Sequence, residues 1–378
     1  MIKITGWTNI YHSYAMVNQW QMLALDDLNT KIAFHEAPKY RETWTPEATP
    51  SGFPVELKRQ LERIKQTTHN EEIKAEYRIT YPYDISRSLN KKVFIFGTSE
   101  YRIYPQEGNV SKDKFINFIN NNDVEFITPS NWSKKGFVRS GIYEEKIHVL
   151  SHGVWKSIFK PTTNKNKLNL RSKLGLREED FVILNIGAMT HNKGVDILLI
   201  AAWHLRDSIP NIRLVFKDAS SLYNLSLKNV VSGFNQQSRE ILVRDLNDKI
   251  INISGNLNIE KMADLYNLAD VYVSPYRAEG FNLPPLEASS CGTPVIITDG
   301  GASDDYYNDI IGYKVESKKV NLKNGGVALE PNLDSLIEKI KLAYSKKQQF
   351  DYSLISQYAH ANFNWHNIAK KLKDILGD

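Results

Sequence analysis

The chain of 378 residues is poor in cysteine and in long hydrophobic runs. Its one cysteine, Cys291, cannot form a disulfide within the chain, and no Cys and His residues have the spacing of a zinc site. The longest apolar run, Ile197 to Trp203, has seven residues, whereas a helix needs about 20 to cross a bilayer. These absences exclude a disulfide framework, and we predict neither a metal site nor a membrane span.

Charge of one sign is also scarce. Lys and Arg number 48 and Asp and Glu 43, which leaves a net charge of +5, too small for a protein that coats nucleic acid. We therefore expect no nucleic-acid partner, although the excess leaves room for peripheral contact with an anionic membrane surface. The first six residues lack the basic and apolar regions of a secretory signal, so we expect a cytoplasmic protein.

The composition, 42% hydrophobic and 24% charged, is that of an ordinary globular protein, and the length predicts two domains. Short β-type runs alternate with helical patterns in both halves, which predicts two doubly wound α/β domains with parallel sheets. The polar stretch Thr162 to Lys167 has no periodicity, and we interpret it as the linker between them.

The segment Ala278 to Ala288 reads AEGFNLPPLEA and carries the strongest chemical pattern. A strand should end at Ser274 and a helix should begin near Leu283, where unpaired N–H groups and the helix dipole form a site for an anion such as phosphate. Glu279 and Glu287 could both face that pocket and accept hydrogen bonds from hydroxyls. The alternative is a capping acid and a solvated helix residue.

A second segment, Asn185 to Gly194, reads NIGAMTHNKG and predicts a strand, a turn and a helix start. Lys193 in that turn can act as a point charge on a phosphate, although a lone lysine is more often a surface residue. Lys217 follows at the carboxyl end of the next predicted strand.

These segments together resemble glycosyltransferase family 4, the retaining GT-B enzymes also described as glycosyl transferases group 1. The family pattern is Glu, seven residues, Glu, with Gly-Phe after the first Glu and a downstream Gly-x-Pro-Val. The residues that match it are Glu279, Gly280, Phe281, Glu287, Gly292, Pro294 and Val295. Gly187, Lys193 and Gly194 match a second family element.

The resemblance implies that Glu279 contacts hydroxyls of the donor sugar and that Glu287 contacts the ribose. The residues expected to bind the donor are Glu287, Gly280, Phe281, Asn282, Leu283, Lys217 and Thr190, and the backbone N–H groups of Phe281 to Leu283 would hold the diphosphate. Asn282 stands where many members have glycine, and Ala188 stands where the family usually has arginine. Lys217 could supply the charge missing at Ala188, and His191 is a second, weaker candidate.

The N-terminal half resembles the family only weakly, and it lacks the paired glycines common in the first loop. His12, between the first strand and the first helix, is a candidate catalytic residue, and so is Glu100, which follows a predicted strand. The alternatives are an ordinary loop histidine and a helix-capping acid. With Glu279 and Lys193 they complete the predicted catalytic set.

The resemblance implies a GT-B fold, in which two Rossmann-like domains face each other across a cleft and the C-terminal helix crosses back. We expect an acceptor-binding domain over 1–162, a nucleotide-sugar domain over 163–355, and a returning helix over 356–378. The implied enzyme is a retaining glycosyltransferase that uses a UDP- or GDP-linked sugar and a saccharide, lipid-linked or protein acceptor. It would need no cofactor or metal.

Two other functions stay open. Sugar-nucleotide epimerases also have two domains of this shape, and Ala188 with the missing glycines would suit a protein that binds a sugar nucleotide without catalysis. A dinucleotide-dependent oxidoreductase is disfavoured because no Gly-x-Gly-x-x-Gly occurs.

Overall fold

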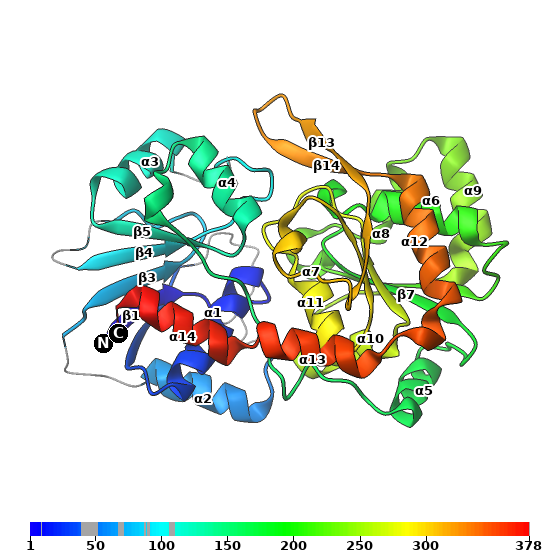
Figure 1. The fold of residues 1–378 in the computed structure, drawn as a ribbon, viewed down its shortest axis with the longest axis horizontal. Coiled ribbons are helices and arrows are strands. Elements are labelled where there is room, and N and C mark those ends of the chain that lie inside the picture. Colours follow the sequence, from blue (N-terminus) through cyan, green and yellow to red (C-terminus); the bar gives the residue numbers. More distant parts are fainter. Residues whose placement is uncertain are drawn as a thin grey trace. The chain divides into compact units, whose positions relative to one another are not determined.

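The computed structural model describes residues 1–8, 10–38, 52–66, 72–86, 88, 91–105 and 110–377. The chain divides into two compact units. Unit 1 comprises Met1–Gly153, Lys323–Gly326 and Phe363–Asp378, and unit 2 comprises Val154–Leu322 and Val327–Asn362. Each unit is built on one six-stranded parallel sheet with helices packed around it (Figure 1).

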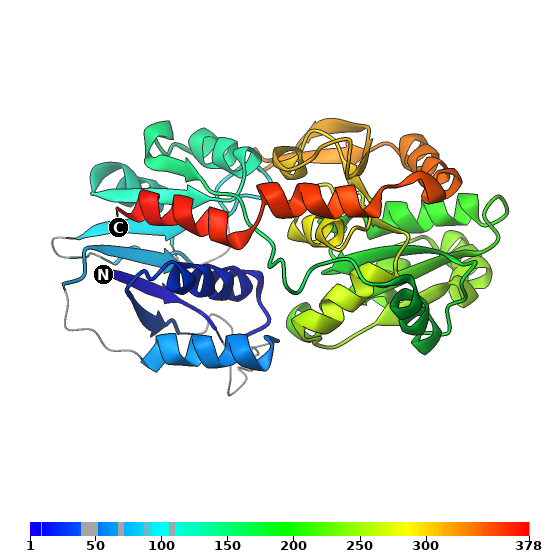
Figure 2. The same cartoon turned by 60° about the horizontal axis from the view of Figure 1, so that its bottom comes forward.

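The sheet of unit 1 has the strand order β2-β1-β3-β4-β5-β6. Its strands are β1 (Ile2–Gly6), β2 (Ile32–Glu36), β3 (Ala75–Ile79), β4 (Lys92–Phe96), β5 (Val124–Thr128) and β6 (Ile147–Val149). Its helices are α1 (Ser13–Asp27), α2 (Val55–Gln66), α3 (Lys112–Asn121), α4 (Asn131–Ser140) and α14 (Trp365–Leu376). The C-terminal helix α14, red in Figure 2, packs against α1 of the same unit.

The sheet of unit 2 has the order β12-β11-β10-β7-β8-β9. Its strands are β7 (Phe181–Gly187), β8 (Ile212–Asp218), β9 (Ile250–Ile253), β10 (Val271–Ser274), β11 (Val295–Thr298) and β12 (Gly312–Val315). A separate antiparallel pair consists of β13 (Ser317–Asn321) and β14 (Val327–Pro331). From β7 the chain adds strands on one side, and from β10 on the other, so the topological switch point lies between these two neighbours.

Two groups of contacting helices cover the unit 2 sheet. One group contains α6 (Val195–Leu205), α8 (Leu227–Ser232), α9 (Gln236–Leu246) and α12 (Leu333–Ser345), and the other contains α5 (Asn164–Lys173), α10 (Ile259–Leu268), α11 (Leu283–Ser290) and α13 (Tyr352–Asn362). The short α7 (Ser220–Tyr223) follows β8. Because both faces are covered, the residues of β10 and β11 are buried throughout, as expected for strands inside a doubly wound domain.

The predicted α/β class with two doubly wound, Rossmann-like domains is confirmed by the two sheets. The predicted linker is wrong in part, because Asn164 to Lys167 form the first turn of α5. Thr163 caps that helix by accepting a hydrogen bond from the Asn166 N–H, and the Lys167 ammonium donates to Ala269 O at 2.8 Å. The polar residues therefore cap and anchor a helix. Among the described residues, no helix is long and apolar enough to cross a membrane.

Candidate functional site

The strongest candidate site lies at the switch point of unit 2, where β7 and β10 are paired neighbours. Loop A (Ala188–Gly194) follows β7 and loop B (Pro275–Asn282) follows β10. In open α/β sheets, ligands bind outside the carboxyl ends of the strands at this position. Most of the predicted donor-site residues lie on these two loops.

Loop A closes with a short 3-10 turn, His191–Lys193, in which the Lys193 N–H donates to Thr190 O at 3.0 Å. Gly194 follows with a φ of +69°, and a Cβ at this position would lie 1.9 Å from Pro275 O. A side chain here would therefore push the two loops apart. The close approach brings Lys193 to loop B.

Lys193 and Glu279 form an ion pair across the two loops. The Lys193 ammonium donates to a Glu279 carboxylate oxygen at 2.5 Å, and the two side chains are 22% and 9% exposed. An ammonium group has three N–H donors, so Lys193 can keep this bond while it donates to a second anion. The structure thus brings together the two residues at the centre of the sequence prediction.

Loop B is held against loop A by Asn192, a residue that was not among the predicted site residues. Its backbone oxygen accepts from the N–H groups of Arg277 and Ala278, at 2.7 and 3.3 Å, and its side-chain amide donates to Ala278 O at 3.0 Å. Asn192 is buried. Only its position beside Lys193 in the sequence could have pointed to it.

Asn282 ends loop B in a left-handed conformation, with a φ of +67°. Its side-chain amide donates to the hydroxyls of Ser274 and Ser303 at 3.1 and 3.2 Å. Its backbone carbonyl accepts from the Tyr306 hydroxyl at 2.7 Å. Asparagine tolerates this conformation better than most residues, which explains how it replaces the glycine of the family pattern. Ser303 and Tyr306 had no sequence signal.

Helix α11 begins at Leu283, as predicted, and prolines occupy the next two positions. Proline has no N–H, so the backbone donors at this helix start come from the residues before Pro284. They are the N–H groups of Phe281 to Leu283, the same groups predicted to hold a diphosphate. The Phe281 ring packs on Tyr306, with centroids 5.2 Å apart, and Gly280 precedes it in the loop.

Glu287 lies one turn into α11 and accepts a hydrogen bond of 2.6 Å from the Tyr266 hydroxyl of α10. The protein around it desolvates this carboxyl and raises its pKa to about 7. Burial raises the pKa of Tyr272, and the charges of Glu279 and Glu287 raise it further. The charges of both carboxylates therefore act on the same buried hydroxyl.

Lys217 lies at the carboxyl end of β8, in register with Ile186 of β7. Its ammonium group is buried, donates to the backbone oxygen of Asp218, and has a pKa lowered by burial. The side chain is thus one strand away from loop A. Its role as the second cation, in place of the arginine absent at Ala188, stays a prediction.

His12 and Glu100 lie in unit 1, at the carboxyl ends of β1 and β4. His12 caps α1 by accepting a hydrogen bond from the Tyr14 N–H at 3.1 Å, and its catalytic role stays a prediction. The Tyr14 hydroxyl lies 3.2 Å from the Thr98 hydroxyl, which ties the start of α1 to the loop after β4. Glu100 is partly exposed, and its backbone oxygen accepts from the Trp132 indole at 2.7 Å.

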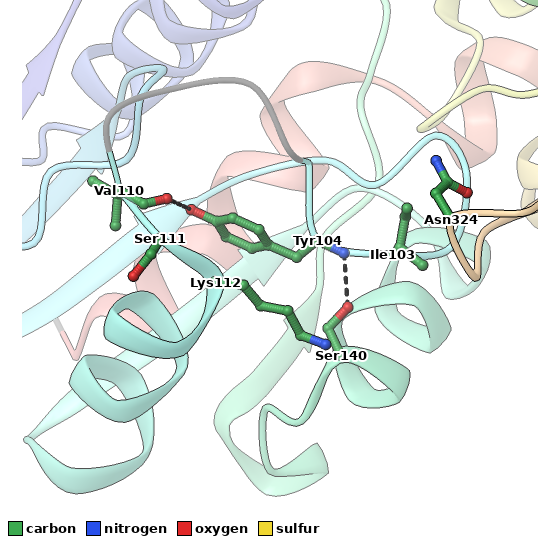
Figure 3. A pocket seen from close by; sticks show the side chains of 7 residues that line it. All are labelled: Ile103, Tyr104, Val110, Ser111, Lys112, Ser140 and Asn324. Carbon is green, nitrogen blue, oxygen red and sulfur yellow. Dashed lines mark hydrogen bonds between the residues drawn. The ribbon is translucent and has the colours of Figure 1, made fainter.

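A pocket of unit 1 contains none of the predicted site residues (Figure 3). Its lining residues are Ile103, Tyr104, Val110, Ser111, Lys112, Ser140 and Asn324. Within the described ranges, no group of three or more His, Cys, Asp or Glu side chains could hold a metal ion.

Comparison with known proteins gives related sequences. The chain is 25% identical to the alpha-galactosylglucosyldiacylglycerol synthase of Streptococcus pneumoniae over 54% of its own length and 52% of the relative. It is 25% identical to the lipopolysaccharide 1,2-N-acetylglucosaminetransferase of Salmonella typhimurium over 67% of its length and 62% of the relative. The chain thus spans about half to three fifths of these relatives.

A solved structure matches nearly the whole chain. The crystal structure of HepE from Anabaena, in complex with UDP and glucose, superposes with a TM-score of 0.68 at 14% identity, covering 100% of this chain and 99% of HepE. This likeness confirms the GT-B fold class predicted from the sequence. The family model "Glycosyl transferases group 1" matches residues 166–351, the segment that carries loops A and B. Residues 166–351 therefore belong to the glycosyl transferases group 1 family, and the narrower assignment to family 4 stays a prediction.

Proposed function

We propose that the protein is a retaining glycosyltransferase that moves a sugar from a nucleoside diphosphate donor, UDP- or GDP-linked, to an acceptor hydroxyl. The observation that carries this proposal is the Lys193–Glu279 pair between loops A and B, beside the start of α11. This part of the site combines a cation and backbone N–H donors, which suit a diphosphate, with a carboxylate, which suits sugar hydroxyls. The family match over the same segment supports the assignment.

Negative charge builds on the diphosphate as the bond to the sugar breaks. Lys193 and the N–H groups before Pro284 stabilise that charge more in the transition state than in the ground state, which is what accelerates the reaction. Glu279 orients the sugar by accepting from its hydroxyls, and Glu287 accepts from the ribose. The leaving phosphate can take the acceptor proton, so the proposal requires no metal and no strong protein base.

We assign the acceptor to the domain predicted over residues 1–162, where His12 and Glu100 follow strands β1 and β4. A carboxylate at Glu100 can orient the acceptor hydroxyl. The names of the two relatives point to glycolipid and lipopolysaccharide products, so we propose a saccharide or lipid-linked saccharide acceptor. Such an acceptor suits a cytoplasmic enzyme with peripheral access to a membrane surface.

The proposal is tested by incubating the full chain with UDP- and GDP-sugars, with and without a panel of saccharide and glycolipid acceptors, in buffer containing EDTA. We expect one donor to release its nucleoside diphosphate only when an acceptor is present, and the product to keep the anomeric configuration of the donor. Conversion of the donor sugar without acceptor would identify an epimerase instead. Tight donor binding with no turnover on any acceptor would identify a binding protein.

A further inference from the structure

Arg277 lies in loop B, two residues before Glu279, and belongs to neither of the two family patterns. Arg277 is 8% exposed. A guanidinium buried to this extent costs free energy unless charged or polar partners compensate it. The partners of Arg277 therefore show what the surrounding structure holds in place.

The partners come from three separate elements. Arg277 donates to both carboxylate oxygens of Asp196, in the first turn of α6, at 2.7 and 3.0 Å. It donates to both carboxylate oxygens of Glu330, in β14, at 3.1 and 3.2 Å. It also donates to His191 O, in the turn that carries Lys193, at 3.0 Å. Burial alone would lower the pKa of Arg277, and the two carboxylates raise it above its ordinary value.

The backbone of Arg277 is fixed as well. Its N–H donates to Asn192 O, and its carbonyl accepts from the Leu329 N–H, both at 2.7 Å. Side chain and backbone together tie loop B to loop A on one side and to β14 on the other. The residues next to these ties, Lys193 and Glu279, are the two that form the ion pair.

The guanidinium of Arg277 also balances the charge of its two carboxylate partners. Asp196 and Glu330 place two carboxylates around Arg277, and the imidazole of His191 lies 3.9 Å from Asp196. Without the guanidinium, these two carboxylates would lose the buried cation that compensates their charge. Lysine cannot replace arginine here, because one ammonium group cannot make two bidentate contacts at once.

We propose that Arg277 is a positioning residue of the transfer reaction, which sets the separation of Lys193 and Glu279 by clamping loop B to Asp196, Glu330 and the Lys193 turn. This inference rests on the proposed function. It concerns the reaction geometry, since Arg277 itself is surrounded by protein partners and contacts substrate in no step.

The test is a double-mutant cycle on the full chain, measured with the best donor and acceptor pair. We expect Arg277→Lys to lower kcat by at least tenfold while it changes the donor KM by less than threefold. In a Glu279→Gln background the same substitution should lower kcat by less than threefold, because the pair it positions is already broken. Arg213→Lys is the matched control, since Arg213 is a partly buried arginine paired with Asp180 at the opposite end of the same sheet.

A merely structural role predicts a different result. It would lower the melting temperature and the folded fraction, leave kcat per folded molecule within threefold of the wild type, and give additive losses in the cycle. Any of these kinetic outcomes would overturn the inference. If the wild-type chain shows neither donor binding nor transfer, the proposed function itself fails, which is a distinct result. Asp196→Asn gives a second route, with an expected loss of kcat in the same direction.

Discussion

At the residue scale, the site depends on a few buried charges that compensate one another. Glu279 is 7% exposed, and a carboxylate in that position beside a diphosphate would be strongly unfavourable without a cation between them. Lys193 supplies that cation at 2.5 Å. In the proposed donor complex, the pair therefore lets a carboxylate and a phosphate share one pocket.

This leads to a prediction for Lys193. Lys193→Ala removes the cation next to the leaving group, and losses of this kind cost roughly 3 to 4 kcal/mol of transition-state stabilisation. We expect kcat to fall by a factor on the order of 100 or more. Lys228→Ala, at an exposed position of α8, is the control and should leave kcat unchanged. Unchanged turnover in Lys193→Ala would remove the basis of the proposed mechanism.

Glu287 gives a prediction of pH dependence. Its pKa in the folded chain is about 7, against 4.5 for an ordinary glutamate, so folding favours the protonated carboxyl. The stability that this group contributes is full below about pH 4.5 and is lost as the pH rises through 7, by up to about 3 kcal/mol. Glu287→Gln keeps an acceptor for Tyr266 and removes the titration.

We therefore expect Glu287→Gln to match the wild type in melting temperature at pH 5 and to exceed it by several degrees at pH 8, without ligand. Glu178→Gln, at an exposed position, is the control and should differ from the wild type equally at both pH values. A melting-temperature difference for Glu287→Gln that stays constant from pH 5 to pH 8 would contradict the raised pKa.

At the scale of elements, the close contact of loops A and B depends on a residue without a side chain. Gly194 and Gly175 both have a φ of +69°, but a Cβ at Gly194 would lie 1.9 Å from Pro275 O, whereas a Cβ at Gly175 meets nothing within 4 Å. An alanine at Gly175 would therefore meet backbone strain alone, whereas an alanine at Gly194 would meet backbone strain and a steric overlap with loop B.

We expect Gly175→Ala to destabilise the chain by about 1 kcal/mol, the cost of the left-handed conformation alone. Gly194→Ala carries the same cost and also displaces loop B, so we expect a loss of more than about 3 kcal/mol together with loss of donor binding. Urea unfolding of both variants measures the difference. Equal losses of unfolding free energy in the two variants would mean that loop B can move away from Gly194→Ala without destabilising the chain, and would contradict the prediction.

The elements also show how far sequence reasoning reaches. Strands such as β7 and β10 were predictable because buried parallel strands read as short apolar runs. The beginning of α11 was predictable from Pro284 and Pro285. The start of α5 was not, because its polar residues are explained only by a cap and by contacts with Ala269 and Asp270, about a hundred positions away.

Some residues of the candidate site could likewise be predicted from the sequence, and others could not. Lys193 and Glu279 belong to compact patterns and were predicted, and the structure pairs them. Arg277, Asp196 and Glu330 act through contacts 53 and 81 residues apart in the sequence, and an ion pair between distant segments leaves no local pattern. Asn282 was expected to permit a backbone contact, but its hydrogen bonds with Ser274 and Ser303 required the fold.

At the scale of the whole molecule, the residues assigned to the donor all lie in unit 2, while His12 and Glu100 lie in unit 1. A ligand that binds only the folded state stabilises it, by about 2.7 kcal/mol at 100 times its dissociation constant. A nucleoside diphosphate should therefore raise the melting temperature of the chain. Because the diphosphate contacts are assigned to loops A and B, its direct effect should fall on unit 2.

Hydrogen exchange on the full chain tests this division. We expect UDP or GDP alone to slow exchange in residues 188–194 and 275–290, and to leave residues 10–14 and 97–101 of unit 1 unchanged. Lys193→Ala should abolish the slowing, whereas Lys228→Ala should retain it. Backbone amides are protected where a ligand orders them. Protection confined to the loops after β1 and β4 would therefore place the nucleotide in unit 1 and overturn the assignment of the donor to unit 2.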